Sequence, residues 1–259
     1  MPSLQVRGAT LDYDVTGDSG PLVVQLHGLT SSRARDAQLG LDLGRALRGH
    51  RVLRYDARAH GRSSGTHREA DYGWDALARD LLALLDHVAP GERVHGVGPS
   101  MGAGTLLHAA VADPGRFASL TLVTPPTAWK RRRAQGDLYR ANADLVERGG
   151  LAAFLALGDT APVPPALADA PETRPAIPPE LLPIVLRGAA STDLPRKKKV
   201  ARIAARTLVL AWTGDRTHPL KTARTLRELI DGSRLIVARS PYGVMAWPGL
   251  FAEHVVTRG

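Results

Sequence analysis

The pentapeptide Gly98-Pro99-Ser100-Met101-Gly102 lies between two segments of different character. Residues 93–97 predict a short buried strand, and residues 105–112 have the small and apolar residues of a helix. A Gly-x-Ser-x-Gly sequence between a strand and a helix is the pattern of a nucleophile elbow, a turn so sharp that only small neighbours fit beside the serine. We therefore predict that the Ser100 hydroxyl is exposed at the end of a buried strand.

Strand-like and helix-like runs alternate on both sides of this turn. After an N-terminal hairpin (residues 4–7 and 9–15), strands are expected at 21–26, 51–55, 93–97, 119–123, 207–212 and 233–238. Helices are expected at about 36–47, 74–88, 221–230 and 248–256. Continuous Val/Leu runs separated by helices are typical of parallel strands covered on both faces. The sequence thus predicts an α/β fold with a mostly parallel, doubly wound sheet.

The alternation is interrupted between Thr124 and Thr207. Helical periodicity occurs there at 138–146, 151–157 and 181–186, and the stretch 161–183 is rich in proline, which breaks helices and favours a course over the surface. We expect residues 1–124 and 207–259 to form the core domain. Residues 125–206 are expected to form a helical cap, inserted after the sixth strand and placed over the carboxyl ends of the strands.

Composition limits the class of protein. The 259 residues are 44% hydrophobic, which suffices for one large α/β domain. No apolar run is long enough to span a membrane, and the first residues lack a signal-peptide pattern, so a cytoplasmic protein is expected. The absence of cysteine excludes disulfides, thiolate metal sites and a cysteine nucleophile. We expect neither a metal nor an organic cofactor, because no phosphate-binding loop or metal-ligand spacing is present.

The net charge of +9 includes two dense basic runs, at residues 130–133 and 196–199. Such runs attract nucleic acid, anionic lipid or acidic partners when they form a binding surface. No nucleic-acid recognition motif accompanies them, so we interpret them as a solvated surface and expect no nucleic acid and no membrane as partner.

Four segments, in chain order, resemble the α/β-hydrolase fold family. They are His27-Gly28-Leu29 after a strand, residues 55–63 after the next strand, the turn around Ser100, and the loop of residues 212–219 that contains Asp215. The resemblance covers nearly the whole chain. It implies a serine hydrolase without cofactor that cleaves a small hydrophobic ester, thioester or lactone, or a natural product, through an acyl-Ser100 intermediate.

The resemblance also implies roles for further residues. The backbone amides of Leu29 and Met101 would stabilise the oxyanion of the tetrahedral intermediate. Asp215, at the carboxyl end of a predicted strand, would orient the catalytic histidine. We place Gly28, His27 and Tyr242 next to the substrate.

The general base departs from the family pattern. The family has its histidine on the loop after the last strand, and residues 239–244 contain none. His218, three residues after Asp215, is the best candidate. His27 and His60 flank the mouth of the site, where we interpret them chiefly as bracing the loops through hydrogen bonds and keep them as alternative bases. If none of them acts as base, the protein is a lyase, cyclase, isomerase or ligand-binding protein that has kept the fold and lost hydrolysis.

Overall fold

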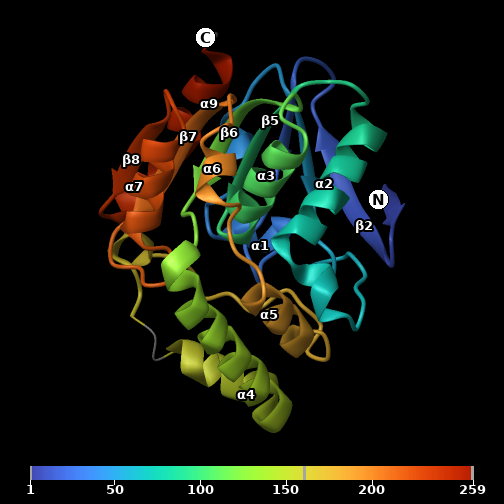
Figure 1. Ribbon diagram of the computed structural model, residues 1–259, viewed down its shortest axis with the longest axis vertical. Coiled ribbons are helices and arrows are strands. Elements are labelled where there is room, and N and C mark those ends of the chain that lie inside the picture. Colours follow the sequence, from blue (N-terminus) through green and yellow to red (C-terminus); the bar gives the residue numbers. More distant parts are fainter. Residues whose placement is uncertain (1, 160–161, 258–259) are drawn as a thin grey trace.

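A computed structural model describes residues 2–159 and 162–257. The domain ranges expected from the sequence also include residues 1, 160, 161, 258 and 259, which lie outside the described residues. The described chain forms an eight-stranded sheet in the order β1-β2-β4-β3-β5-β6-β7-β8 (Figure 1). The strands are β1 (Ser3–Val6), β2 (Ala9–Thr16), β3 (Leu22–Gln25), β4 (Arg51–Tyr55), β5 (Val94–Pro99), β6 (Phe117–Val123), β7 (Arg206–Trp212) and β8 (Arg234–Ala238). β2 pairs antiparallel with β1 and β4, and the other pairs are parallel. The predicted α/β sheet is confirmed.

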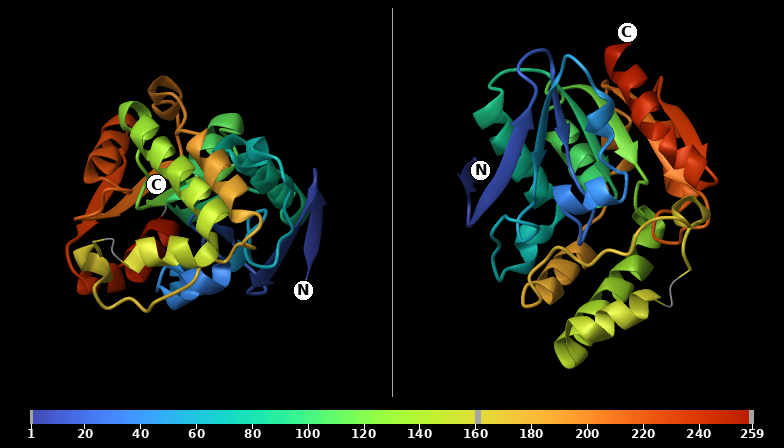
Figure 2. Two further views of the ribbon diagram at one scale, coloured as in Figure 1. Left: turned by 90° about the horizontal axis from the view of Figure 1, so that it is seen from below. Right: turned by 180° about the vertical axis from the view of Figure 1, so that it is seen from behind.

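Helices cover both faces of the sheet (Figure 2). One face packs against α2 (Trp74–Val88), α3 (Met101–Ala112) and α7 (Leu220–Leu229), and the other against η1 (Leu43–Ala46) and α9 (Trp247–Val256). The central strands β3 and β5 are buried along their whole length. Burial on both faces explains why β3 reads as a nearly continuous apolar run rather than as an alternating pattern.

After β6 the chain leaves the sheet and forms helices at the carboxyl ends of the strands (Figure 1). They are η3 (Trp129–Arg131), α4 (Arg132–Asp159), η4 (Pro165–Leu167), α5 (Leu182–Ala190) and α6 (Lys197–Val200), after which the chain returns to β7. α4 and α5 pack through an apolar cluster that also includes Ala59 and Tyr72 from the core. The predicted cap after the sixth strand is thus present, and its extent, residues 125–206, remains our proposal.

Two elements differ from the sequence prediction. The helix expected at 36–47 is divided into α1 (Arg33–Gln38) and η1, because Gly40 has a φ of 71° that ends the helix. The loop expected after β8 forms a short helix, α8 (Pro241–Met245). Both depend on the backbone of one or a few residues, which hydrophobic periodicity does not report. The helices expected at 138–146 and 151–157 both lie in α4, where the non-helical Gly150 (φ 70°, ψ −173°) separates them as the sequence predicts.

Candidate active site

Ser100 lies in a strained turn between β5 and α3. Its φ of 51° and ψ of −109° are outside the regions that residues with side chains prefer. A Cβ atom on either Gly98 or Gly102 would lie 2.9 Å from the Cβ atom of Leu26, closer than side chains pack. Both glycines are therefore required because the end of β3 passes directly beside the turn.

The segment after Leu26 brings a second backbone loop to Ser100. A Cβ atom on Gly28 would lie 3.9 Å from the Cβ atom of Ser100, so the loop runs in van der Waals contact with the serine. Within the described part of the chain, the amides of Leu29 and Met101 donate to no protein acceptor. Met101 is also the first residue of α3, where the helix dipole favours negative charge. These features fit the predicted oxyanion role of both amides, which stays a prediction.

Asp215 and His218 lie on one loop after β7 and reach Ser100 from there. The His218 Nδ1 atom is 2.7 Å from the Asp215 Oδ2 atom, and the His218 Nε2 atom is 2.8 Å from the Ser100 Oγ atom. With Nδ1–H donating to the carboxylate, Nε2 is free to accept the hydroxyl hydrogen. The structure therefore joins the three predicted side chains in one hydrogen-bonded chain.

The Asp215 carboxylate is held as an anion by its donors. Its Oδ1 atom accepts hydrogen bonds from the amides of Thr217 and His218, at 2.8 and 3.0 Å. Its Oδ2 atom also accepts one from the Trp212 indole, at 2.8 Å. Burial by itself raises the pKa of Asp215, but hydrogen bonds from His218 and Trp212 and the charge of His218 outweigh it and lower the pKa well below its ordinary value. The carboxylate is thus ionised at neutral pH.

His27 and His60 are buried and bonded to backbone groups through both ring nitrogens. The Nδ1 atom of His27 donates to the Gly28 carbonyl and its Nε2 atom accepts from the Ala57 amide. His60 contacts the Arg58 carbonyl and the Thr30 amide in the same way. Burial lowers the pKa of both, that of His60 to about 3. Because no ring nitrogen remains for a serine proton, both histidines brace the loops around the site.

Tyr242 lies on α8 and is 82% exposed. It forms no hydrogen bond with the described side chains of Ser100, Asp215 or His218. Its expected contact with a substrate therefore stays a prediction that the geometry does not strengthen.

Two residues that the sequence analysis did not single out contribute to this site. Trp212 donates to Asp215 and stacks on Trp247, with ring centroids 5.7 Å apart. The Thr127 amide, at the entry to the cap, donates to the Thr217 carbonyl at 2.9 Å. The contact between Trp212 and Asp215 could have been predicted, because a tryptophan lies three residues before the aspartate. The contact between Thr127 and Thr217 joins residues far apart in the sequence, and no sequence pattern predicts it.

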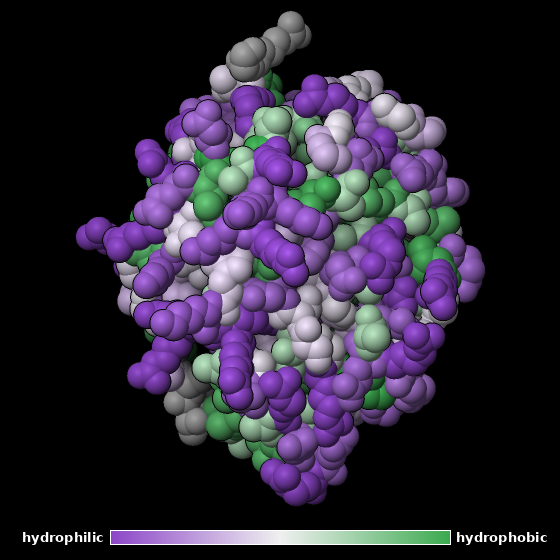
Figure 3. Space-filling model, viewed as in Figure 1, coloured by the Kyte–Doolittle hydropathy of each residue, from purple (hydrophilic) through white to green (hydrophobic). Residues whose placement is uncertain are grey.

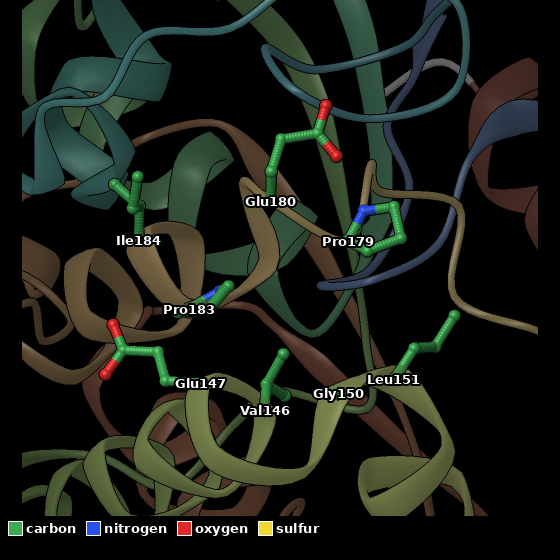
Figure 4. Close-up of a pocket in the computed structure, with 8 residues that line it drawn as sticks. All are labelled: Val146, Glu147, Gly150, Leu151, Pro179, Glu180, Pro183 and Ile184. Atoms are coloured by element: carbon green, nitrogen blue, oxygen red, sulfur yellow. The ribbon is translucent and has the colours of Figure 1, made fainter.

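The cap contains a cleft of about 390 Å³ between α4 and the start of α5 (Figure 4). Apolar side chains such as Val146, Leu151 and Ile184 line it together with Glu147 and Glu180. None of the residues of the Ser100–His218–Asp215 chain lines this cleft. Leu182 and Val185, next to residues of the cleft in the sequence, are buried in the apolar cluster of the cap.

The described residues include no group of three or more histidine, cysteine or acidic side chains arranged to hold a metal ion. Among the helices that the structure describes, none has the length and apolar character needed to cross a bilayer.

Comparison with known proteins identifies the family. Residues 21–147 match the model of the alpha/beta hydrolase fold. A putative carbamate hydrolase of Variovorax paradoxus is 39% identical over 148 residues, which are 56% of this chain and 53% of that protein. A 3-oxoadipate enol-lactonase of Acinetobacter baylyi is 29% identical over 153 residues, 58% of this chain and 53% of the lactonase. The chain thus spans about half the length of these curated relatives.

A solved hydrolase from Pseudomonas aeruginosa matches along nearly the whole chain. Its TM-score is 0.77 at 28% identity, with 99% of this chain and 98% of that chain covered. Together with the sheet order and the turn at Ser100, these matches establish that the chain belongs to the α/β-hydrolase fold family.

Proposed function

We propose that this protein is a serine hydrolase that cleaves carboxylic esters, thioesters or lactones through an acyl-Ser100 intermediate. The observation that carries the proposal is the unbroken hydrogen-bonded chain from Asp215 through His218 to Ser100. A serine hydroxyl is a weak nucleophile until a base accepts its proton, and this chain supplies both the base and the carboxylate that orients it.

The proposed reaction follows from these contacts. The Ser100 Oγ atom attacks the carbonyl carbon while His218 Nε2 takes the hydroxyl proton, and the anionic Asp215 stabilises the imidazolium. The amides of Leu29 and Met101 stabilise the oxyanion, each contributing roughly 3–4 kcal/mol in hydrolases of known mechanism. His218 then protonates the leaving oxygen or sulfur. In the second half, His218 takes a proton from water, which attacks the acyl carbon. The bond to the Ser100 Oγ atom then breaks, and His218 returns the proton to that oxygen as the acid is released.

The base comes from the loop after β7 instead of the loop after β8. Asp215 and His218 are three residues apart, and the two amides bound to Asp215 Oδ1 fold the intervening turn so that the imidazole points at Ser100. The alternative of a lyase, cyclase or ligand-binding protein rested on the missing histidine after the last strand. The contact between His218 and Ser100 weighs against that alternative.

The substrate class follows from the reaction that the reacting groups can perform. The relatives carry the names of a carbamate hydrolase, a lipase, an enol-lactonase and a thioesterase. All four reactions begin with attack by a nucleophile on an acyl carbon that is bonded to a heteroatom. An uncharged nucleophile and an oxyanion site suit that step for any of these leaving groups. We therefore place substrate choice in the cap and not in the reacting residues.

Turnover of p-nitrophenyl butyrate and of a γ-lactone, measured for the wild type and Ser100→Ala, tests the proposal. We expect Ser100→Ala to lose at least 10³-fold in kcat/KM and to retain the wild-type circular dichroism spectrum. Ser191→Ala, at the exposed end of α5, is the matched control and should keep full activity. Normal turnover by folded Ser100→Ala would refute the acyl-enzyme mechanism.

A further inference from the structure

The two basic runs, more than sixty residues apart in the sequence, lie side by side in the structure. Trp129, immediately before the first run, donates its indole N–H to the Pro195 carbonyl, immediately before the second run, at 3.1 Å. The Trp129 amide also bonds to the Asp193 carboxylate. The ammonium group of Lys197 lies 5.1 Å from the centre of the Trp129 ring. These contacts hold η3 against α6 and merge the runs into one basic surface.

The cations of this basic surface face solvent without acidic partners. They are Lys130, Arg131, Arg133, the run Arg196–Lys199 and Arg202, all exposed. Among the described residues, none of them forms an ion pair with a carboxylate. Figure 3 shows hydrophilic side chains gathered over α6 on this face of the molecule. Uncompensated like charges repel one another, so holding them together costs free energy that an anionic partner would recover.

An apolar pocket of about 220 Å³ opens at the edge of the basic surface. Ala110, Val111 and Pro114, at the end of α3, form it together with Ile203. Lys199 and Arg202 line its rim. A pocket of this size accepts one aliphatic side chain, with two cations placed to meet the charges beside it.

We propose that the basic surface binds an acidic protein segment that inserts one apolar side chain into the pocket between α3 and α6. Charge complementarity and the concave apolar pocket together favour this partner, because interface anchors of proteins are apolar side chains seated in pockets and surrounded by polar contacts. A nucleic-acid backbone carries phosphates and no apolar side chain to fill the pocket.

A bilayer surface fits less well than a protein. Membrane-surface proteins insert protruding apolar side chains between the lipids. The large hydrophobic residues that are exposed in the described chain, such as Leu138, Tyr242 and Met245, lie outside the two basic runs and the pocket. The basic surface is therefore shaped to receive an apolar side chain and not to insert one.

Fluorescence anisotropy with a defined peptide tests this proposal. The probe is a labelled 20-residue helical peptide of Glu and Ala with one central Leu, titrated with the full chain at 50, 150 and 300 mM NaCl. We expect binding that weakens with salt, and Lys198→Glu/Lys199→Glu should weaken it at least tenfold at 150 mM. Replacing the peptide Leu by Ala should weaken it about tenfold, as expected for one buried aliphatic side chain.

Arg45→Glu/Arg48→Glu is the matched control variant. It changes the net charge by the same amount at exposed positions near η1, on the opposite face of the sheet, and should change the affinity less than twofold. Equal weakening by both double variants would show attraction by net charge alone and overturn the proposal. An unchanged affinity for the Ala peptide would overturn it as well. Tighter binding of a 20-base-pair DNA duplex or of phosphatidylglycerol vesicles, lost in Lys198→Glu/Lys199→Glu, would assign the surface to those partners instead.

Discussion

At the scale of single residues, the Asp215 carboxylate organises the site. It accepts the indole of Trp212, the imidazole of His218 and the amides of Thr217 and His218. Each donor fixes part of the turn, so the His218 ring has one orientation in which Nε2 meets Ser100. The carboxylate that we propose to orient the base thereby also holds the loop that carries His218.

Trp212→Phe removes one donor to Asp215 and keeps an aromatic ring against Trp247. A hydrogen bond to a charged group contributes roughly 1.5–3 kcal/mol, and part of it stabilises the imidazolium in the transition state. We expect kcat to fall about five- to tenfold while KM changes little, as measured by steady-state ester hydrolysis. An unchanged kcat would mean that the indole only packs and does not support the carboxylate.

The buried Asp36, in α1, makes the free energy of unfolding depend on pH. Its Oδ1 atom accepts a hydrogen bond from Ser31 at 2.5 Å, while its buried Oδ2 atom has no partner among the described residues. Burial raises the pKa of Asp36 to about 7. In the unfolded chain the carboxyl loses its proton near its ordinary pKa of 3.8, so the folded state loses stability as the pH rises from about 4 to about 7.

Asp36→Asn keeps the acceptor for Ser31 and removes the ionisation. Relative to the wild type, we expect the free energy of unfolding of Asp36→Asn to rise by about 2–4 kcal/mol between pH 4 and pH 8. Urea unfolding at the two pH values measures this difference. A difference between the two proteins that does not change with pH would contradict a raised pKa.

At the scale of elements, the turn between β5 and α3 is fixed by its glycines and by the strand beside it. The end of β3 approaches so closely that Leu26 excludes a Cβ atom at Gly98 and at Gly102. The same strand leads into His27-Gly28-Leu29. Strand packing therefore sets the distance between the serine and the predicted oxyanion amides.

Gly102→Ala tests this close approach. The added Cβ atom would lie 2.9 Å from Leu26 Cβ and 3.0 Å from the His27 carbonyl oxygen, so we expect a loss of about 1–3 kcal/mol in the free energy of unfolding. Gly249→Ala, in α9, is the control: nothing lies within 4 Å of its added Cβ atom, so it should stabilise the protein by about 0.5–1 kcal/mol. Thermal unfolding of both variants measures the two effects. Equal unfolding midpoints would contradict the crowding at Gly102.

The sequence predicts the helices and strands that have a regular pattern of apolar residues along their own length. Apolar runs give the parallel strands, and α2 begins and ends at the predicted residues, Trp74 and Val88. The division of the helix near Gly40 depends instead on the backbone angle of one glycine. For the site, the turn at Ser100 and the loop at Asp215 are predictable from motifs. That His27 and His60 brace the loops is also expected from the sequence, but the identity of their backbone partners is not, because the Ala57 and Thr30 amides come from other loops.

At the scale of the whole molecule, the parallel sheet brings the loops after β3, β5 and β7 to one edge, and the cap lies over that edge (Figure 1). The buried Arg132 donates to the Thr192 and Ala189 carbonyls within the cap. It also lies 4.3 Å over the ring of Trp74, at the start of the core helix α2. The apolar cluster of the cap includes few core residues. The segments around η3 and α6 pack instead in the main core cluster, through residues such as Ala128 and Val200. We therefore propose that α4 and α5 open as a unit without disturbing the sheet.

Hydrogen exchange tests this division of the chain. We expect the amides of α4 and α5 to exchange at least 100-fold faster than those of β5 and β6, because opening the cap breaks fewer contacts than global unfolding. Mass spectrometry of peptic fragments resolves the two groups. Equal protection of these helices and the sheet would show that α4 and α5 are part of one cooperative unit with the core.

The rate at which a fluorophosphonate modifies Ser100, followed by intact mass, tests the central claim that His218 is the base. The wild type should gain one adduct, which is absent in Ser100→Ala, and His218→Ala should react at least 100-fold more slowly. His67→Ala, which removes an exposed histidine, should react at the wild-type rate. Modification of folded His218→Ala at the wild-type rate would contradict the claim and leave Ser100 to be activated by another group.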